Sequence, residues 1–331
     1  MASTHHSLTL PIRDLSDVGE ARRTVELLTA SSAFDATRIG QLRIIVTELA
    51  TNLVKHANGG ELVVRQVTGM EGAGIELLSI DRGPGIAHIM RAMEDGYSTA
   101  GSPGNGLGAM KRLSQRFDVY SQEGVGTIFS IYFGQPQRED HLAIGLVCVP
   151  YPGEQECGDS AGVFPLEQGY RLLMVDGLGH GSDAAAAAAL AQEVGKNLFK
   201  QTPVAMLDSL HAALRATRGA AVAAITVDTT KQTLTFAGVG NIAGSLLAEG
   251  KTRGLASYNG IIGHQVHKVR EIEYNLHSPW LLILTTDGIT TRWKLDGYPG
   301  IQHCHPSIIA GLFYRDYRRE RDDATVMVVR G

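Results

Sequence analysis

The chain has 331 residues, 44% of them hydrophobic and 19% charged, which is typical of a folded protein long enough for two domains of ordinary size. A net charge of −4 argues against a nucleic-acid partner, because it leaves no basic excess for phosphate contacts. Three cysteines without a CxxC pair, no signal-peptide pattern and no apolar run of ~20 residues predict a cytoplasmic protein with no membrane segment.

The first half alternates helices with strands. Apolar residues recur at helical spacing along 41–57, and a second helix is expected at 17–30, capped by Ser16 or Asp17. Strands are expected at 8–12, 61–67, 75–81 and within 117–133, with a glycine-rich stretch and one or two helices in 86–116. The pattern predicts an α/β sandwich that ends at the polar stretch 134–140, giving domains 1–135 and 136–331.

The second half is richer in strands. Apolar runs occupy 141–149, 170–175, 221–227, 233–237, 243–247, 280–286 and 324–329, and two helices are expected at about 182–200 and 203–217. These elements predict layers of strands with helices outside them.

Polar residues on the 41–57 helix suggest chemistry. Glu48 and Asn52 are four residues apart and share one face, which Lys55 extends. Taken alone, these residues could form an ordinary solvated helix surface. The predicted strand end at Asp81, followed by Gly83 and Gly85, favours a functional site over a solvated helix surface. Such a carboxylate can accept a hydrogen bond from an adenine amino group while the backbone passes close to the ring.

A glycine-rich segment then precedes a helix. Gly104, Gly106 and Gly108 would expose backbone N–H groups at the helix start, which is a phosphate-binding arrangement. The run does not follow a first βα strand, so a dinucleotide-binding fingerprint is rejected.

The sequences ELATNLVKHA, DRGPGI, AMEDGYSTAGSPGNGLGAMKRLS and GVGT resemble the motifs of the GHKL (Bergerat) ATPase superfamily, and most of all its stressosome kinases and anti-sigma factors of the RsbT type. The resemblance implies ATP and Mg²⁺ as cofactors, with Asn52 as an Mg²⁺ ligand, Glu48 as the base or orienting group and Asp81 as the adenine acceptor. It also implies nucleotide contacts from Lys55, the motif glycines and Thr127. Arg82 departs from the family, which commonly has Asn or Gln there.

Acidic residues flank apolar runs of the second half: Asp159, Asp176, Asp287 and the pair Asp322-Asp323. A single Asp-Gly at a strand end is usually a turn. Four acidic strand ends that converge would instead form an oxygen site for Mg²⁺ or Mn²⁺. Two such ions can bind a phosphoryl group and activate a water.

The sequences GDSAGVF, LLMVDGLGHG, LTTDGI and RDDATVMVVR resemble the SpoIIE/RsbX class of PPM-type serine/threonine phosphatases, which have a β-sandwich flanked by helices. By that resemblance Asp176 bridges two metal ions and is catalytic. Asp287 and Asp322, in preference to Asp323, complete one metal site, and Asp159 and the Gly177 carbonyl serve the other.

Together the two resemblances imply a bifunctional switch enzyme that phosphorylates and dephosphorylates a regulator, expected to be a STAS-domain protein. The alternative is a first domain that binds ATP and clasps a partner, such as a sigma factor, while only the phosphatase is catalytic. Glu48 beside Asn52 favours phosphoryl transfer, because a pure binding domain needs no base.

Overall fold

The computed structural model describes residues 6–29, 34–68, 73–89, 106–135 and 142–331. The chain forms two compact units. The first unit contains Ser7–His141 and Leu295–Arg315, and the second unit contains Met1–His6, Leu142–Lys294 and Asp316–Gly331. Residues 295–315 therefore pack with the first unit, although in sequence they lie inside the second half.

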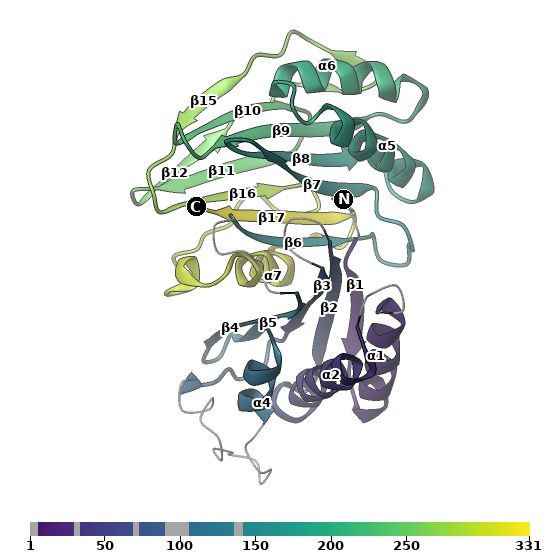
Figure 1. The fold of residues 1–331 in the computed structure, drawn as a ribbon, viewed down its shortest axis with the longest axis vertical. Helices are drawn as coiled ribbons and strands as arrows, with labels where there is room; N and C mark the ends of the chain where they lie inside the picture. The colour runs from purple at the N-terminus through teal and green to yellow at the C-terminus, as the bar shows by residue number, and fades with distance from the viewer. Residues whose placement is uncertain (1–5, 30–33, 69–72, 90–105, 136–141) are drawn as a thin grey trace. The chain divides into compact units, whose positions relative to one another are not determined.

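The first unit is built on one antiparallel sheet with strand order β1-β2-β3-β5-β4 (Figure 1). The strands are β1 (Leu8–Ile12), β2 (Gly60–Val67), β3 (Gly74–Ile80), β4 (Arg116–Gln122) and β5 (Gly126–Gly134). Among the described residues, the core on this sheet includes side chains from the helices α1 (Leu15–Leu28), α2 (Ala36–Ala57) and α4 (Gly106–Leu113). Ile45 and Leu49 of the predicted stripe are fully buried in that core.

The starts of α1 and α2 differ from the predicted ones because of their caps. Asp14, and not Ser16 or Asp17, caps α1, since its carboxylate accepts the Ser16 N–H at 2.7 Å. Asp17 completes a capping box by accepting the backbone N–H of the cap residue. Helix α2 begins at Ala36, earlier than predicted, because Asp35 accepts the Arg38 N–H at 2.8 Å.

Helix α7 (Pro306–Tyr317), which the sequence analysis did not predict, supplies the late segment of the first unit. Its residues from Pro306 to Arg315 are all buried, so it lacks the polar face that makes helical periodicity visible in a sequence. A Cβ added to Gly311 would lie 3.3 Å from Ile128 and 3.5 Å from Ile80 and Leu78. The missing side chain lets this turn of the helix approach the sheet closely.

A buried ionic cluster ties α7 to the same sheet. Glu76 on β3 accepts hydrogen bonds from Arg65 on β2 at 2.8 Å, from Arg116 on β4 at 2.6 Å and from the Ser307 hydroxyl at 2.5 Å. Burial alone would raise the pKa of Glu76, but the two guanidinium groups and Ser307 lower it to about 2. The carboxylate is therefore ionised and fully paired.

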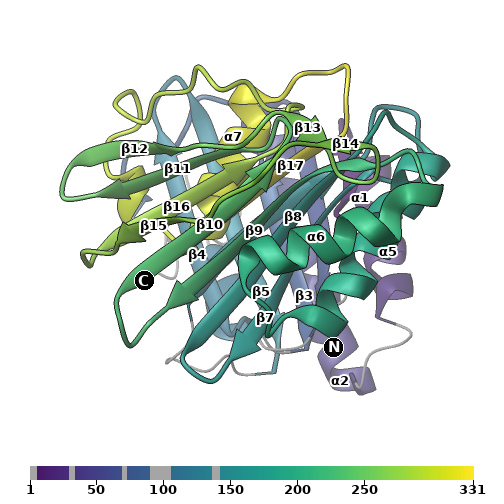
Figure 2. The same ribbon diagram turned by 90° about the horizontal axis from the view of Figure 1, so that it is seen from above.

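The second unit contains two five-stranded sheets, ordered β15-β10-β9-β8-β7 and β12-β11-β16-β17-β6 (Figure 2). The strands of the first sheet are β7 (Asp159–Leu166), β8 (Gly169–Gly177), β9 (Ala220–Asp228), β10 (Thr233–Val239) and β15 (Ile272–Asn275). Those of the second are β6 (Ala143–Val149), β11 (Ala243–Ala248), β12 (Lys251–Leu255), β16 (Trp280–Thr285) and β17 (Ala324–Arg330). A hairpin of β13 (Gly260–Ile261) and β14 (Gln265–Val266) forms a separate two-stranded sheet.

Two helices, α5 (Ser182–Leu198) and α6 (Pro203–Ala213), cover the outer face of the β7–β10 sheet (Figure 2). The alanine run of α5 serves this packing, since Ala188 and Ala191 are buried against the sheet core. The predicted fold class, an α/β chain of two domains with a layered, strand-rich second half, is confirmed. In the described part of the chain, none of the helices combines the length and the apolar character needed to cross a membrane.

Candidate functional site

The predicted catalytic side chain of the first unit lies beside the start of α4. Glu48 and Asn52 are half-buried on α2, while Lys55 in its last turn is exposed. A Cβ added to Gly106 would contact a carboxylate oxygen of Glu48, so the first residue of α4 lies directly over this side chain. The structure thus brings Glu48 next to a helix N-terminus, the part of a helix that favours anionic groups.

Asp81 is fixed at the end of β3. Its carboxylate accepts the Gly83 N–H at 2.8 Å and the Thr127 N–H at 3.0 Å, and its own N–H donates to the Thr127 carbonyl at 3.0 Å. Burial raises the pKa of Asp81, and the two backbone hydrogen bonds oppose that rise. Thr127 therefore holds Asp81 in place, in addition to any contact it makes with a ligand.

Glycines make the surroundings of Asp81 possible. A Cβ added to Gly83 would lie 2.8 Å from Ala57, so the loop after β3 lies against the end of α2. Gly85 has a φ of +75°, which favours glycine. Of the other predicted glycines, Gly108 is buried within α4, and Gly104 lies outside the described residues.

The second unit places two of its acidic residues side by side. Asp159 on β7 and Asp176 on β8 are cross-strand partners. Asp159 is buried and accepts a hydrogen bond from the Thr286 hydroxyl at 2.7 Å. Its pKa is raised, first by burial and then by the charge of Asp176.

Asp176 is buried among other carboxylates. Burial, followed by the charges of Asp287 and Asp322, raises its pKa to about 8. Its Oδ2 atom is buried and accepts no hydrogen bond from the described residues. A buried carboxylate oxygen with no donor and three acidic neighbours is the environment that a divalent cation would stabilise.

Asp287 follows β16, and Asp322 precedes β17. Asn241 donates a hydrogen bond to Asp287 at 2.5 Å, and the pKa of Asp322 is raised by burial and by Asp287. A cavity of about 500 Å³ opens beside the two carboxylates, with Arg319 and Arg321 on its wall. Asp159, Asp176, Asp287 and Asp322 are therefore electrostatic neighbours, as the convergence of strand ends predicts.

Asp323 has a different environment from Asp322. Both of its carboxylate oxygens accept backbone N–H groups, from Tyr151 at 2.7 Å and from Gly158 at 3.0 Å. These bonds attach the start of β17 to the loop before β7. The geometry favours Asp322 as the carboxylate available to a metal ion, and its assignment as a ligand stays a prediction.

Gly177 is the last residue of β8. Its N–H donates to the Gly158 carbonyl at 2.9 Å, and a Cβ there would contact the Ala184 carbonyl oxygen. The end of β8 therefore lies so close to Gly158 and to the start of α5 that only glycine fits at position 177.

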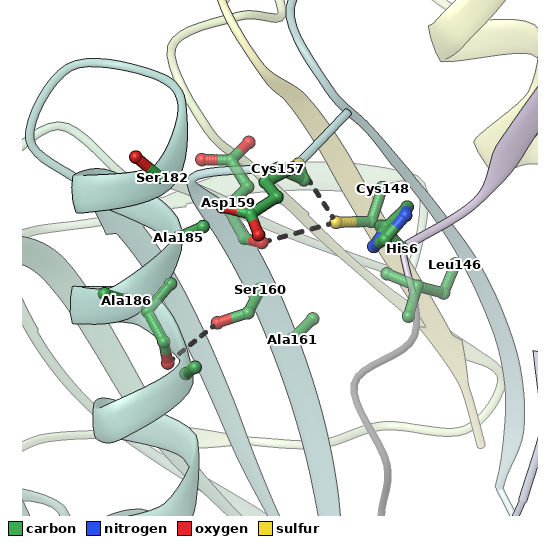
Figure 3. A pocket seen from close by; sticks show the side chains of 13 residues that line it. His6, Leu146, Cys148, Cys157, Asp159, Ser160, Ala161, Ser182, Ala185 and Ala186 are labelled. Carbon is green, nitrogen blue, oxygen red and sulfur yellow. Dashed lines mark hydrogen bonds between the residues drawn. The ribbon is translucent and has the colours of Figure 1, made fainter. Parts of the chain in front are cut away.

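A second cavity of about 440 Å³ opens on the other side of Asp159, beside α5 (Figure 3). Cys148 and Cys157 line it with their sulfur atoms 3.6 Å apart, and Cys148 also contacts the Asp159 carbonyl. The neighbouring thiol of Cys148 and burial raise the pKa of Cys157, which favours the uncharged form of this thiol.

Among the described residues, no three or more His, Cys, Asp or Glu side chains form a group that could hold a metal ion as a side-chain cage. Such a cage is not required for Mg²⁺, which usually retains several waters and uses only one or two carboxylates. The orphaned oxygen of Asp176 and the all-oxygen donor set fit a hard divalent ion.

Sequence reasoning missed two residues that support this site. Thr286 bonds Asp159, and Asn241 bonds Asp287. Both had a sequence signal, since Thr286 directly precedes a predicted ligand and Asn241 follows a strand end and Gly240. Neither signal identifies the carboxylate that the residue bonds, because the two partners are far apart in sequence. The separation is 127 positions for Thr286 and Asp159 and 46 positions for Asn241 and Asp287.

Comparisons with known proteins match the two halves of the chain separately, and the second match includes residues 295–315. A family model described as a histidine kinase-like ATPase domain matches residues 13–133, and one described as stage II sporulation protein E (SpoIIE) matches residues 167–330. The serine/threonine-protein kinase RsbT of Bacillus subtilis (strain 168) is 33% identical over 111 residues, which cover 34% of this chain and 84% of RsbT.

The solved structures that are similar to this chain include two with TM-scores above 0.5. One is described as the bacterial stressosome, a modular system adapted to control secondary messenger signalling; it is 28% identical with a TM-score of 0.55 and covers 58% of this chain and 100% of its own. A crystal structure of RsbX in complex with magnesium is 18% identical with a TM-score of 0.54 and covers 59% of this chain and 97% of its own. At that identity the likeness to RsbX shows the fold alone.

Proposed function

Because the chain belongs to the histidine kinase-like ATPases through residues 13–133 and to the SpoIIE family through residues 167–330, we propose that it is a bifunctional phosphorylation switch. The first unit transfers a phosphoryl group from ATP to a serine or threonine of a partner protein. The second unit hydrolyses phosphoserine or phosphothreonine on the same partner or a sister protein.

The observation that carries the phosphatase half is the unsatisfied oxygen of Asp176 among three other carboxylates. Mg²⁺ or Mn²⁺ would be held by Asp159, Asp176, Asp287, Asp322 and the Gly177 carbonyl. Such ions neutralise phosphoryl oxygens and lower the pKa of a bound water. Thr286 and Asn241 orient two of these carboxylates through their hydrogen bonds.

The kinase half rests on Glu48, Asn52 and Asp81. Asp81 presents a fixed acceptor to the adenine amino group, and Asn52 would hold the Mg²⁺ that accompanies ATP. Glu48 beside Gly106 orients the attacking hydroxyl of the partner and takes its proton. The likeness to RsbT, itself described as a serine/threonine-protein kinase, supports transfer over binding alone.

The partner we propose is a STAS-domain regulator of the stressosome type. The likeness to RsbT and to a structure described as the bacterial stressosome supports this class. A sigma factor would be the partner if the first unit only binds.

The test is the time course of partner phosphorylation, followed by mass spectrometry with ATP, Mg²⁺ and Mn²⁺. Glu48→Gln should slow phosphorylation by ~10²–10⁴-fold, because a positioned base contributes about that much. Asn52→Ala should abolish it, and both variants should still dephosphorylate. Asp287→Asn should let the phosphorylated partner accumulate, because the opposing hydrolysis is lost.

Matched controls separate these effects from general damage. Glu20→Gln on α1 and Asp208→Asn on α6 change exposed acidic residues outside both sites and should behave as wild type. Two results would contradict the kinase activity: Glu48→Gln phosphorylates the partner at the wild-type rate, or Asp287→Asn accumulates no phosphorylated partner. In either case the first unit would be a domain that only binds ATP and a partner.

A further inference from the structure

The first unit contains a buried cation that comes from the second half of the sequence. Arg315 lies near the end of α7 and is 8% exposed. Its Nη1 atom donates to the backbone carbonyl oxygen of Asp81 at 3.0 Å. In return, the Arg82 guanidinium donates to the Arg315 carbonyl, so α7 and the loop after β3 hold each other by two hydrogen bonds.

This contact completes the set of bonds that fixes Asp81. The N–H of Asp81 donates to Thr127, its carboxylate accepts from Gly83 and Thr127, and its carbonyl accepts from Arg315. The carbonyl bond is charge-assisted and buried, which makes it stronger than a neutral hydrogen bond. It is also the only bond to Asp81 in the described structure that comes from outside residues 83–127.

Independent contacts hold α7 against the same sheet, so Arg315 approaches Asp81 from a fixed support. Ser307 bonds Glu76 at one end of the helix, and the Tyr314 hydroxyl donates to Glu61 at 2.8 Å near the other. Gly311 packs closely on the sheet between these two points. A support of this kind is what a precisely oriented acceptor needs.

We propose that Arg315 is a positioning residue of the nucleotide site, which sets the orientation of Asp81 toward adenine. The proposal rests on the proposed function, in which Asp81 reads the base. Adenine offers an amino donor to this carboxylate, whereas guanine offers a carbonyl oxygen that the carboxylate repels. The orientation of Asp81 therefore controls the preference for ATP over GTP as well as the affinity for ATP.

The test measures ATP and GTP dissociation constants by calorimetry on the full chain with Mg²⁺. Arg315→Met keeps an unbranched apolar stem and removes the charge and the hydrogen-bond donors of the guanidinium. We expect ATP affinity to fall about tenfold, as for the loss of one hydrogen bond to a charged group, with GTP affinity almost unchanged. Arg315→Lys should recover part of the ATP preference, because it restores a cation and a donor.

Tyr314→Phe is the matched control. It removes the hydroxyl that bonds Glu61 from the neighbouring position of α7 and leaves the Asp81 contact in place. A structural loosening of α7 would lower the melting temperature in both variants and weaken ATP and GTP binding together. A fall in the ATP-to-GTP affinity ratio in Arg315→Met, absent in Tyr314→Phe, supports positioning.

Two failures can be told apart. If wild type binds ATP with a clear preference over GTP and Arg315→Met keeps that preference, the role of Arg315 is overturned and the nucleotide site stands. If wild type itself does not bind ATP, the proposed function of the first unit fails. Should Arg315→Met not fold, Arg315→Gln takes its place, because it also removes the cation. An ATP-to-GTP affinity ratio equal to that of wild type would then overturn the proposal.

Discussion

The carboxylate of Asp176 is buried close to three other acidic side chains. Because the pKa of Asp176 is raised to about 8, the metal-free protein must bind a proton at this carboxyl group to fold at pH 7, whereas Asp176→Asn needs none. We therefore expect the variant to be more stable than wild type by at least about 1 kcal/mol when EDTA is present. It should also lose aryl phosphate hydrolysis by at least about 100-fold, because a bridging metal ligand is gone.

Melting curves recorded with and without Mn²⁺ measure the change in stability independently of enzyme activity. Mn²⁺ should raise the melting temperature of wild type and leave Asp176→Asn almost unchanged, since a ligand stabilises only the form that binds it. Equal gains in both proteins, or full activity of wild type in EDTA, would contradict the metal site.

Glu76 makes a pH-dependent contribution to stability. Its pKa falls from the ordinary glutamate value of 4.5 to about 2 in the folded protein. A depressed acid contributes stability that is present above its unfolded pKa and lost as pH falls through the folded one. We therefore expect a contribution of about 3 kcal/mol at pH 7 that disappears between about pH 4.5 and 2.

The contribution of Glu76 to the free energy of unfolding can be measured by denaturant unfolding of wild type and Glu76→Gln from pH 7 down to about pH 2. The difference between the two proteins should be largest at neutral pH, where the variant leaves Arg65 and Arg116 without their carboxylate, and should shrink in acid. Glu123→Gln, at an exposed turn, is the control and should track wild type. A pH-independent difference would show that Glu76 is not ionised in the fold.

At the scale of elements, α7 depends on its single glycine. Gly311→Leu should destabilise the protein by about 1–3 kcal/mol, because Leu78, Ile80 and Ile128 leave no room for a large side chain. Gly311→Ala should be neutral or slightly stabilising. Its methyl group would lie 3.3 Å from Cγ2 of Ile128 and 3.5 Å from the terminal methyl groups of Ile80 and Leu78, which requires only a small shift. Alanine also favours a helix over glycine by up to about 1 kcal/mol. Thermal melting of the three proteins tests this order, and a neutral Gly311→Leu would contradict the close packing.

At the scale of the whole molecule, the first unit draws on two separate parts of the chain. A fragment of residues 1–135 lacks α7 and leaves Ile80, Ile128 and the Glu76 cluster without their cover. We expect this fragment to melt at a lower temperature alone than with a synthetic peptide of residues 295–315, which buries that apolar surface again. The same peptide carrying Gly311→Leu is the control, and equal melting with either peptide or none would contradict the prediction.

The sequence by itself determined both domain types, the strand ends that carry the acidic residues and most regular elements. These features are local, since Asp-Gly after an apolar run or Glu48 and Asn52 on one helix face can be read from neighbouring residues. The start of helix α1 could not be predicted from local sequence in this way. Asp14, Ser16 and Asp17 are all suitable N-cap residues, and only the structure shows that Asp14 is the cap.

Only the tertiary structure decided which distant residues meet. It assigned 295–315 to the first unit, placed Arg315 on Asp81 and paired Thr286 with Asp159. Helix α7 was invisible in the sequence because burial on all sides removes the alternation of polar and apolar residues. Its partners lie more than 200 positions away, so its place depends on long-range packing and buried charge, which no local pattern encodes.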